Sequence, residues 1–172
     1  RQLFDVPEGE REVINVDLLR FRVADKTFAL FLSDVVEVLR MVKFVPLPKA
    51  PPDIYGVINC RGMMIPLLNP GLLLGQEVAP ALTANLIVVF AGGQHIALMV
   101  DSVEGVATVQ QSDLKLDLQG QSDHQTLPRH FSGYIRTGSE NIFLLDVEQL
   151  LDLEDRKTLN IALRVRDEWG QG

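Results

Sequence analysis

Short runs of apolar and β-branched residues, separated by two or three turn-forming residues, recur along most of the chain. Residues 18–23 (LLRFRV) and 27–32 (TFALFL) flank Ala24-Asp25-Lys26, a pattern typical of a β-hairpin. Three further hairpins are predicted in the same way: residues 55–59 and 63–68 around Cys60-Arg61-Gly62, residues 85–91 and 95–100 around Gly92-Gly93, and residues 133–137 and 141–146 around Gly138-Ser139-Glu140. The fold is therefore predicted to be mainly β.

Other segments have different patterns. Residues 35–40 and 103–109 are extended runs, and four prolines within residues 44–53 exclude a central strand there, so we expect an ordered loop or a one-turn helix. The polar residues 111–130 predict a long surface loop. Asp146 is placed as the N-cap of a helical pattern, and residues 155–169 predict a terminal helix whose docking site the sequence does not indicate.

The chain also resembles itself. Residues 28–39 match residues 96–107 at an offset of 68, and residues 56–58 and 65–69 match residues 133–135 and 142–146 at an offset of 77. Such a duplication indicates two small β-barrels side by side. The expected divisions are an N-terminal extension (1–16), a first barrel half (17–83), a second barrel half (84–153) and a helical tail (154–172). Because a barrel of about 70 residues is marginal alone, the two should share an apolar seam.

Composition narrows the functional classes. The net charge of −7, from 16 basic and 23 acidic residues, has the wrong sign for binding a phosphate backbone. Residues 63–153 hold ten acids and three bases, so one face is acidic, either as a solvated surface or as a docking face for a basic partner. The single cysteine, Cys60, favours a reducing compartment, and no export signal opens the chain, so we expect a cytoplasmic protein without membrane insertion.

Enzymatic motifs are missing from the sequence. The three histidines lie outside metal-ligand spacing of one another, and no nucleophile elbow, phosphate-binding loop or dinucleotide fingerprint is present. We therefore expect no catalysis, no cofactor and no metal site.

Several motifs together resemble one family. They are Phe28 with Val35-Val36-Glu37-Val38, Pro46-x-Pro48, Gly56-Val57-Ile58-Asn59-Cys60-Arg61-Gly62 followed by Pro66, Val100-Asp101-x-Val103, and Gly133-Tyr134-Ile135 with Leu144-Leu145-Asp146. Over residues 18–152 the chain is similar to the CheW family of bacterial chemotaxis coupling proteins. The resemblance implies two intertwined, SH3-like, five-stranded β-barrels with short helices and a non-catalytic scaffold. It also implies two partners: the cytoplasmic tip of a chemoreceptor, and the regulatory domain of a CheA-type histidine kinase.

The resemblance points to two groups of site residues. For receptor binding they are Val36, Glu37, Val38, Arg61 and Gly62, and for kinase binding Val45, Pro46 and Leu47. Each group has a structural alternative: Arg61 pairs internally with Glu37, Glu37 protects an edge strand, and the 45–47 loop packs on its own barrel.

Two further expectations concern a pair of methionines and the other functions that the sequence allows. The adjacent Met63 and Met64 should point to opposite faces of a strand, one in the core and one in a binding surface. Other functions that fit are a CheW-like regulatory module of a larger kinase or receiver-fused protein, and an SH3-like peptide-binding module without a chemotaxis role.

Overall fold

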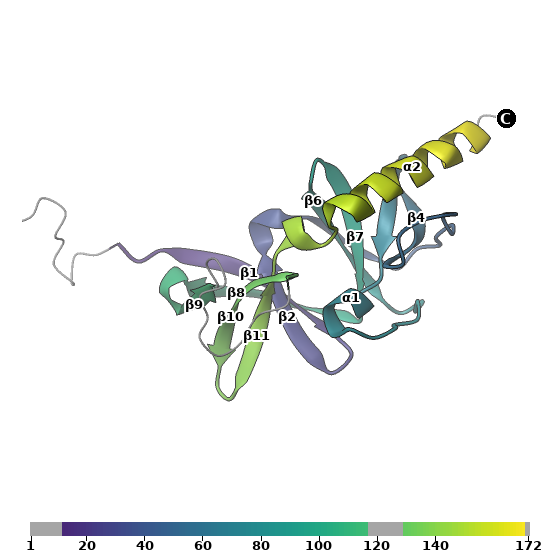
Figure 1. The fold of residues 1–172 in the computed structure, drawn as a ribbon. Helices are drawn as coiled ribbons and strands as arrows, with labels where there is room; N and C mark the ends of the chain where they lie inside the picture. The colour runs from purple at the N-terminus through teal and green to yellow at the C-terminus, as the bar shows by residue number, and fades with distance from the viewer. Residues whose placement is uncertain (1–11, 117–128, 171–172) are drawn as a thin grey trace, which may run out of the picture.

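The computed structural model describes residues 12–116 and 129–170 (Figure 1). Its strands confirm the four predicted hairpins and the two extended runs: β1 (Asn15–Val23), β2 (Lys26–Phe31), β3 (Val35–Arg40), β4 (Ile54–Cys60), β5 (Met63–Leu68), β6 (Asn85–Ala91), β7 (Gln94–Val100), β8 (Ser102–Gln110), β9 (Leu114–Leu116), β10 (Phe131–Thr137) and β11 (Glu140–Leu145). The α-helices are α1 (Gly71–Leu74) and α2 (Leu153–Gly170), and one-turn 3₁₀ helices follow β2 (Leu32–Asp34), β8 (Gln111–Asp113) and β11 (Val147–Gln149). Of the predicted surface loop 111–130, residues 117–128 lie outside the described residues.

The strands form two sheets that exchange elements between the two sequence repeats. One sheet has the order β8-β1-β2-β11-β10-β9 and the other β3-β6-β7-β5-β4. The first two strands of each repeat thus pair with the later strands of the other repeat, so a boundary between residues 83 and 84 does not separate the two sheets. The first sheet has six strands rather than the expected five because β9 adds three residues to it. The counterpart of β9 in the second sheet is a single bridge between Val45 and Val57.

The two repeats share one close backbone approach. A Cβ atom at Gly56 would lie 2.1 Å from the carbonyl oxygen of Val45, and one at Gly133 would lie 2.3 Å from that of Lys115. Only glycine allows the Val45 segment to pack so tightly on β4 and the Lys115 segment on β10. This explains in physical terms why the Gly-x-Ile motif recurs in both halves.

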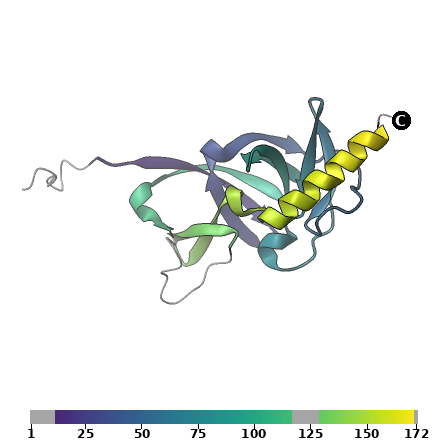
Figure 2. The ribbon, with the colours of Figure 1, turned by 45° about the horizontal axis from the view of Figure 1, so that its top comes forward.

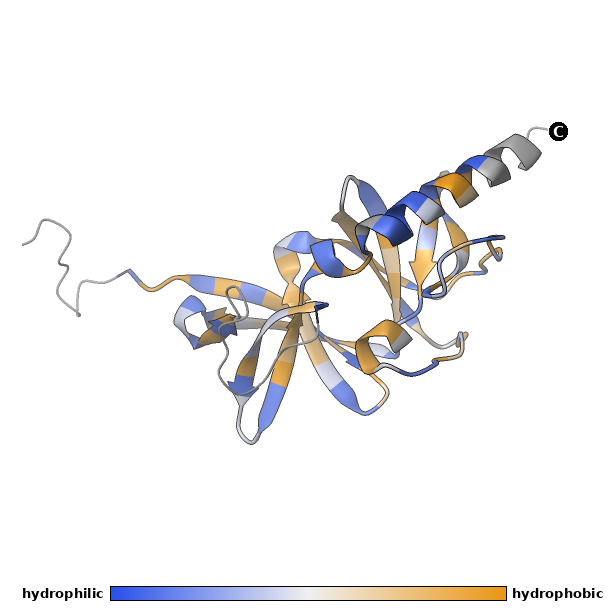
Figure 3. Ribbon diagram, in the orientation of Figure 1, coloured by the Kyte–Doolittle hydropathy of each residue, from blue (hydrophilic) through white to orange (hydrophobic). Residues whose placement is uncertain are grey.

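The core has three parts. One cluster fills the inside of each sheet, with Ile58 and Met99 in the second sheet and Leu18 and Ile142 in the first. The third and largest cluster joins residues of both sheets, among them Phe21, Phe28, Leu30, Ile87, Val89, Ile96 and Leu98. Apolar residues are concentrated in the central strands (Figure 3). The predicted apolar seam is confirmed, and it explains why the central residues of β2, β6 and β7 are buried on both faces.

Helix α2 lies alongside the sheet that contains β4, β6 and β7 (Figures 1 and 2). Leu159 and Ala162 are buried in the shared core, so the predicted terminal helix is confirmed and its docking site is now defined. The Arg156 guanidinium donates hydrogen bonds to the backbone carbonyls of Glu148 (2.6 Å) and Leu151 (3.2 Å). In the described ranges, no helix has the length and apolar character needed to cross a membrane.

Candidate docking site

Strand β3 is an edge strand of the second sheet and carries three of the predicted receptor-binding residues. Its pairing with β6 shifts between Val35 and Glu37, which leaves Val36 in a bulge. Val36 and Val38 are 49% and 41% exposed, while Glu37 between them is partly buried. The sequence could not indicate which valines face solvent, and the structure assigns Val36 and Val38 to the surface.

The β4–β5 turn brings the other two predicted residues next to β3. Arg61 and Gly62 both have positive φ angles, 53° and 83°, as two-residue hairpin turns favour. The Asn59 side chain accepts a hydrogen bond from the Gly62 N–H (3.0 Å), which fixes the turn. The turn therefore holds the Arg61 side chain at the end of the sheet.

Glu37 and Arg61 form an ion pair with a separation of 3.1 Å. The Cys60 thiol lies 3.8 Å from the second carboxylate oxygen of Glu37. The Arg61 side chain is nevertheless 80% exposed, compared with 22% for Glu37, so most of the guanidinium faces solvent. Internal pairing and partner binding are thus compatible: Glu37 orients a guanidinium whose remaining N–H groups can take a second carboxylate.

The predicted kinase-binding residues divide into exposed and buried positions. Val45 exchanges two backbone hydrogen bonds of 2.9 Å with Val57 and is 44% exposed. Pro46 is exposed as well. Leu47 is 7% exposed and packs in the shared core, so its side chain anchors the loop and is not available to a partner. The surface part of this group is therefore Val45 with Pro46.

The expectation that one of the two methionines lies in the core is wrong. Met63 and Met64 are both exposed, at 45% and 39%, because they lie at the tip of the β4–β5 hairpin beyond the packed part of the sheet. The parallel register of β5 and β7 places the β6–β7 turn at the same end. There Phe90, 51% exposed, packs edge-on against His95 with a centroid distance of 5.0 Å. The sequence did not predict that Phe90 is exposed, because Phe90 lies in an apolar run, residues 85–91, whose pattern is typical of a fully buried strand.

Two groups of carboxylates lie along the segment between β11 and the first turn of α2. Burial, followed by the charges of Asp146 and Glu148, raises the pKa of Asp34 above its ordinary value. Burial and the charge of Asp152 likewise raise the pKa of Asp155. The carboxylates of Asp34, Asp146 and Glu148 thus lie close together beside the start of β3.

His130 lies near the start of α2 and is also perturbed. Its pKa is lowered, first by burial and then by the charge of Arg129. Among the described residues, no group of three or more His, Cys, Asp or Glu side chains has an arrangement that could hold a metal ion.

Comparison with known proteins gives the family. The family model for the CheW-like domain matches residues 17–155. The chemotaxis protein CheW of Rhizobium meliloti is 29% identical over 143 residues, which cover 82% of this chain and 90% of the relative. The chemotaxis protein CheW of Thermotoga maritima is 26% identical over 136 residues, covering 79% and 87%.

The fold is shared with a solved structure. The scaffolding protein TtCheW from Thermoanaerobacter tengcongensis superposes with a TM-score of 0.71 at 24% identity, covering 83% of this chain and 96% of that protein. At this identity the similarity concerns the fold. The family match over most of the chain, the recurrent Gly-x-Ile approach and the two-sheet architecture agree, and the chain belongs to the CheW family.

Proposed function

We propose that this chain is a non-catalytic adaptor that couples the cytoplasmic tips of chemoreceptors to a CheA-type histidine kinase. Its relatives carry the name chemotaxis protein CheW, and a protein of the same fold is described as a scaffold. In this role the chain acts in the cytoplasm and is recruited to membrane-associated receptor arrays. Two modest contacts are sufficient for such a linker, because tethering raises the effective concentration of each partner.

The receptor contact is assigned to Val36, Glu37, Val38, Arg61 and Gly62. The observation that carries this assignment is the exposed guanidinium of Arg61, oriented by Glu37 beside exposed valines of an edge strand. An apolar strip with one fixed cation fits an amphipathic helix that presents apolar residues and a carboxylate. The kinase contact is assigned to the exposed Val45 and Pro46, with Leu47 holding their loop in place.

A charge reversal tests the receptor contact. Arg61→Glu should weaken capture by an immobilised receptor tip about tenfold or more, since it sets two carboxylates against an acidic helix. The fold should persist, because an exposed ion pair contributes only about 0–1 kcal/mol. Arg136→Glu, an exposed arginine on β10 of the other sheet, is the matched control and should bind as the wild type does.

The double variant Glu37→Arg with Arg61→Glu separates the two roles of Arg61. It restores an internal ion pair with the charges exchanged. If Arg61 contacts the receptor, the double variant stays defective, whereas full recovery would show that only the internal pair matters. Kinase-domain binding should be unaffected in both variants, and should instead fall in Val45→Asp.

A further inference from the structure

The four methionines of the chain differ in their access to solvent. Met99 is 1% exposed in the core inside the second sheet, and Met41 is partly buried against the same cluster. Met63 and Met64, by contrast, are 45% and 39% exposed at the tip of the β4–β5 hairpin. Because an oxidant must reach the thioether sulfur, Met63 and Met64 are the methionines open to oxidation.

The two exposed methionines lie on opposite faces of β5. Side chains alternate along a strand, so Met63 shares a face with Ile65 and Leu67, which belong to the core inside the second sheet. Met64 shares the other face with Leu68, which belongs to the core between the sheets. Two adjacent residues of the same type and of similar exposure therefore occupy two different surfaces.

Met63 is on the surface that carries the proposed receptor contact. It lies directly opposite Cys60 in the pairing of β4 with β5, and opposite residues share a face of the sheet. The Cys60 thiol is 3.8 Å from the Glu37 carboxylate, which in turn pairs with Arg61 at 3.1 Å. Met63 therefore lies on the same side of the sheet as the Glu37–Arg61 pair, and Met64 lies on the other side.

The β6–β7 hairpin extends this surface. Phe90 and His95 lie opposite each other and alternate with Val88 and Ala97, which belong to the core inside the second sheet. The parallel register of β5 with β7 aligns Met63 with the β6–β7 turn. An exposed thioether, an exposed aromatic ring and an oriented guanidinium are thus placed at one end of the sheet.

We propose that Met63 is an oxidation site through which hydrogen peroxide weakens the receptor contact, an inference that rests on the proposed function. The thioether sulfur attacks one oxygen of the peroxide, so an S–O bond forms and the O–O bond breaks. The hydroxide that leaves takes the proton from the transferred oxygen and becomes water. Sulfur is oxidised by two electrons, the peroxide is reduced, and the product is the polar methionine sulfoxide.

The sulfoxide changes the docking surface without changing its charge. Its oxygen is hydrated in the free protein and must lose this water when a receptor helix covers the surface. Capture of the receptor tip should therefore weaken about tenfold. A sulfoxide at Met64 adds an equal polarity on the opposite face of β5, where it should have little effect.

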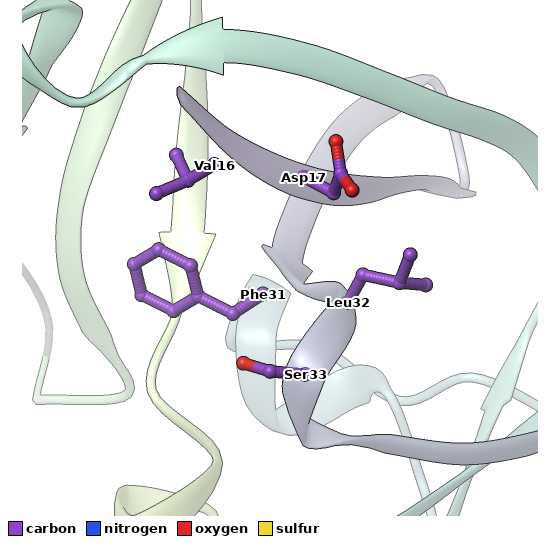
Figure 4. Close-up of a pocket in the computed structure, with 5 residues that line it drawn as sticks. All are labelled: Val16, Asp17, Phe31, Leu32 and Ser33. Atoms are coloured by element: carbon purple, nitrogen blue, oxygen red, sulfur yellow. The ribbon is translucent and has the colours of Figure 1, made fainter. Parts of the chain in front are cut away.

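Peroxide should leave the rest of the described structure unchanged. Met99 is buried, and Cys60, the remaining sulfur, is only 8% exposed. A hollow of about 410 Å³ between β1 and the turn after β2 contains no sulfur. It is lined by Val16, Asp17, Phe31, Leu32 and Ser33 (Figure 4). A loss of capture after mild oxidation is thus expected to come from the β4–β5 hairpin.

Peptide mass spectrometry tests the accessibility of the site. In dilute hydrogen peroxide, Met63 and Met64 should form sulfoxide several-fold faster than Met99. A rate at Met63 no higher than that at Met99 would overturn the proposal.

Two single variants test the effect on binding. Met64→Leu keeps Met63 as the exposed methionine, and Met63→Leu keeps Met64, while both retain Met41, Met99 and Cys60. Each variant is treated with peroxide, freed of oxidant and compared with its own untreated form for capture by an immobilised receptor tip. On oxidation, capture should fall about tenfold for Met64→Leu and hardly change for Met63→Leu.

Reversal separates methionine from cysteine oxidation. The two methionine sulfoxide reductases, one for each sulfoxide epimer, should restore capture by oxidised Met64→Leu, whereas a thiol alone should not. Undiminished capture by oxidised Met64→Leu, an equal loss in both variants, or recovery with the thiol alone would overturn the proposal. An untreated wild type that captures no receptor tip would contradict the proposed function, and this proposal with it.

Discussion

Replacing Gly56 with alanine should destabilise the protein far more than a single methyl group suggests. The added Cβ would lie 2.1 Å from the Val45 carbonyl oxygen, whereas such contacts essentially never fall below 3.0 Å. The Val45 segment must therefore move by roughly 1 Å, which breaks both of its hydrogen bonds to Val57. Two lost backbone bonds at about 1 kcal/mol each, together with about 1–3 kcal/mol of packing strain, give a loss of about 3–5 kcal/mol.

Urea unfolding of three variants measures this effect. Gly133→Ala, with its Cβ 2.3 Å from the Lys115 carbonyl oxygen, should lose a similar free energy of unfolding. Gly62→Ala meets open space at a φ of 83° and should lose only about 1–2 kcal/mol, the penalty for left-handed backbone. If Gly56→Ala is no less stable than Gly62→Ala, the close approach does not constrain the fold and the reasoning fails.

Three further outcomes follow from the structure. Burial and two neighbouring carboxylates raise the pKa of Asp34 above 3.8, so the folded state binds its proton more tightly than the unfolded chain does, and this residue's contribution to stability falls as pH rises through the folded pKa. Asp34→Asn should therefore raise the free energy of unfolding at neutral pH, a gain that should vanish below pH 3.8; a gain independent of pH would contradict this cause. Arg156→Ala removes two hydrogen bonds to backbone carbonyls and should lower stability by about 1–3 kcal/mol in thermal melts and speed amide exchange in α2, whereas the exposed Lys157→Ala should do neither. Burial raises the pKa of Tyr55 to about 12, so ultraviolet titration should show a late tyrosine ionisation that Tyr55→Phe abolishes.

Many elements of the fold could be predicted from local sequence patterns. Alternation, turn residues and prolines depend on a few neighbouring positions, so the hairpins and the 44–53 loop could be predicted from the sequence. The repeat also predicted the apolar seam, because two small barrels cannot bury enough surface separately. A helical pattern beginning at Asp146 was predicted from its spacing, and the structure has a one-turn 3₁₀ helix there, Val147–Gln149, ahead of α2. Asp146 is its N-cap and accepts a hydrogen bond from the Glu148 N–H.

Long-range pairing could not be predicted in the same way. A duplicated sequence is compatible with strands pairing within a repeat or between repeats. In the structure four pairs join different repeats: β1 with β8, β3 with β6, β5 with β7 and β11 with β2. Similarly, Leu47 and Val45 have equivalent apolar side chains in the sequence, but one is buried and the other exposed. The sequence is compatible with an internal Glu37–Arg61 pair, but the high exposure of the guanidinium depends on the geometry of the turn.

The most direct test of the proposed function is whether the chain bridges a receptor tip and a kinase regulatory domain. A receptor signalling tip is immobilised, and a kinase regulatory domain is offered with and without this chain. The kinase domain should be retained only when the chain is present, and Arg61→Glu and Val45→Asp should each lower retention about tenfold or more while the fold persists. Retention of the kinase domain without the chain, or binding of the two partners only in competition with each other, would contradict the claim that the chain holds both at once.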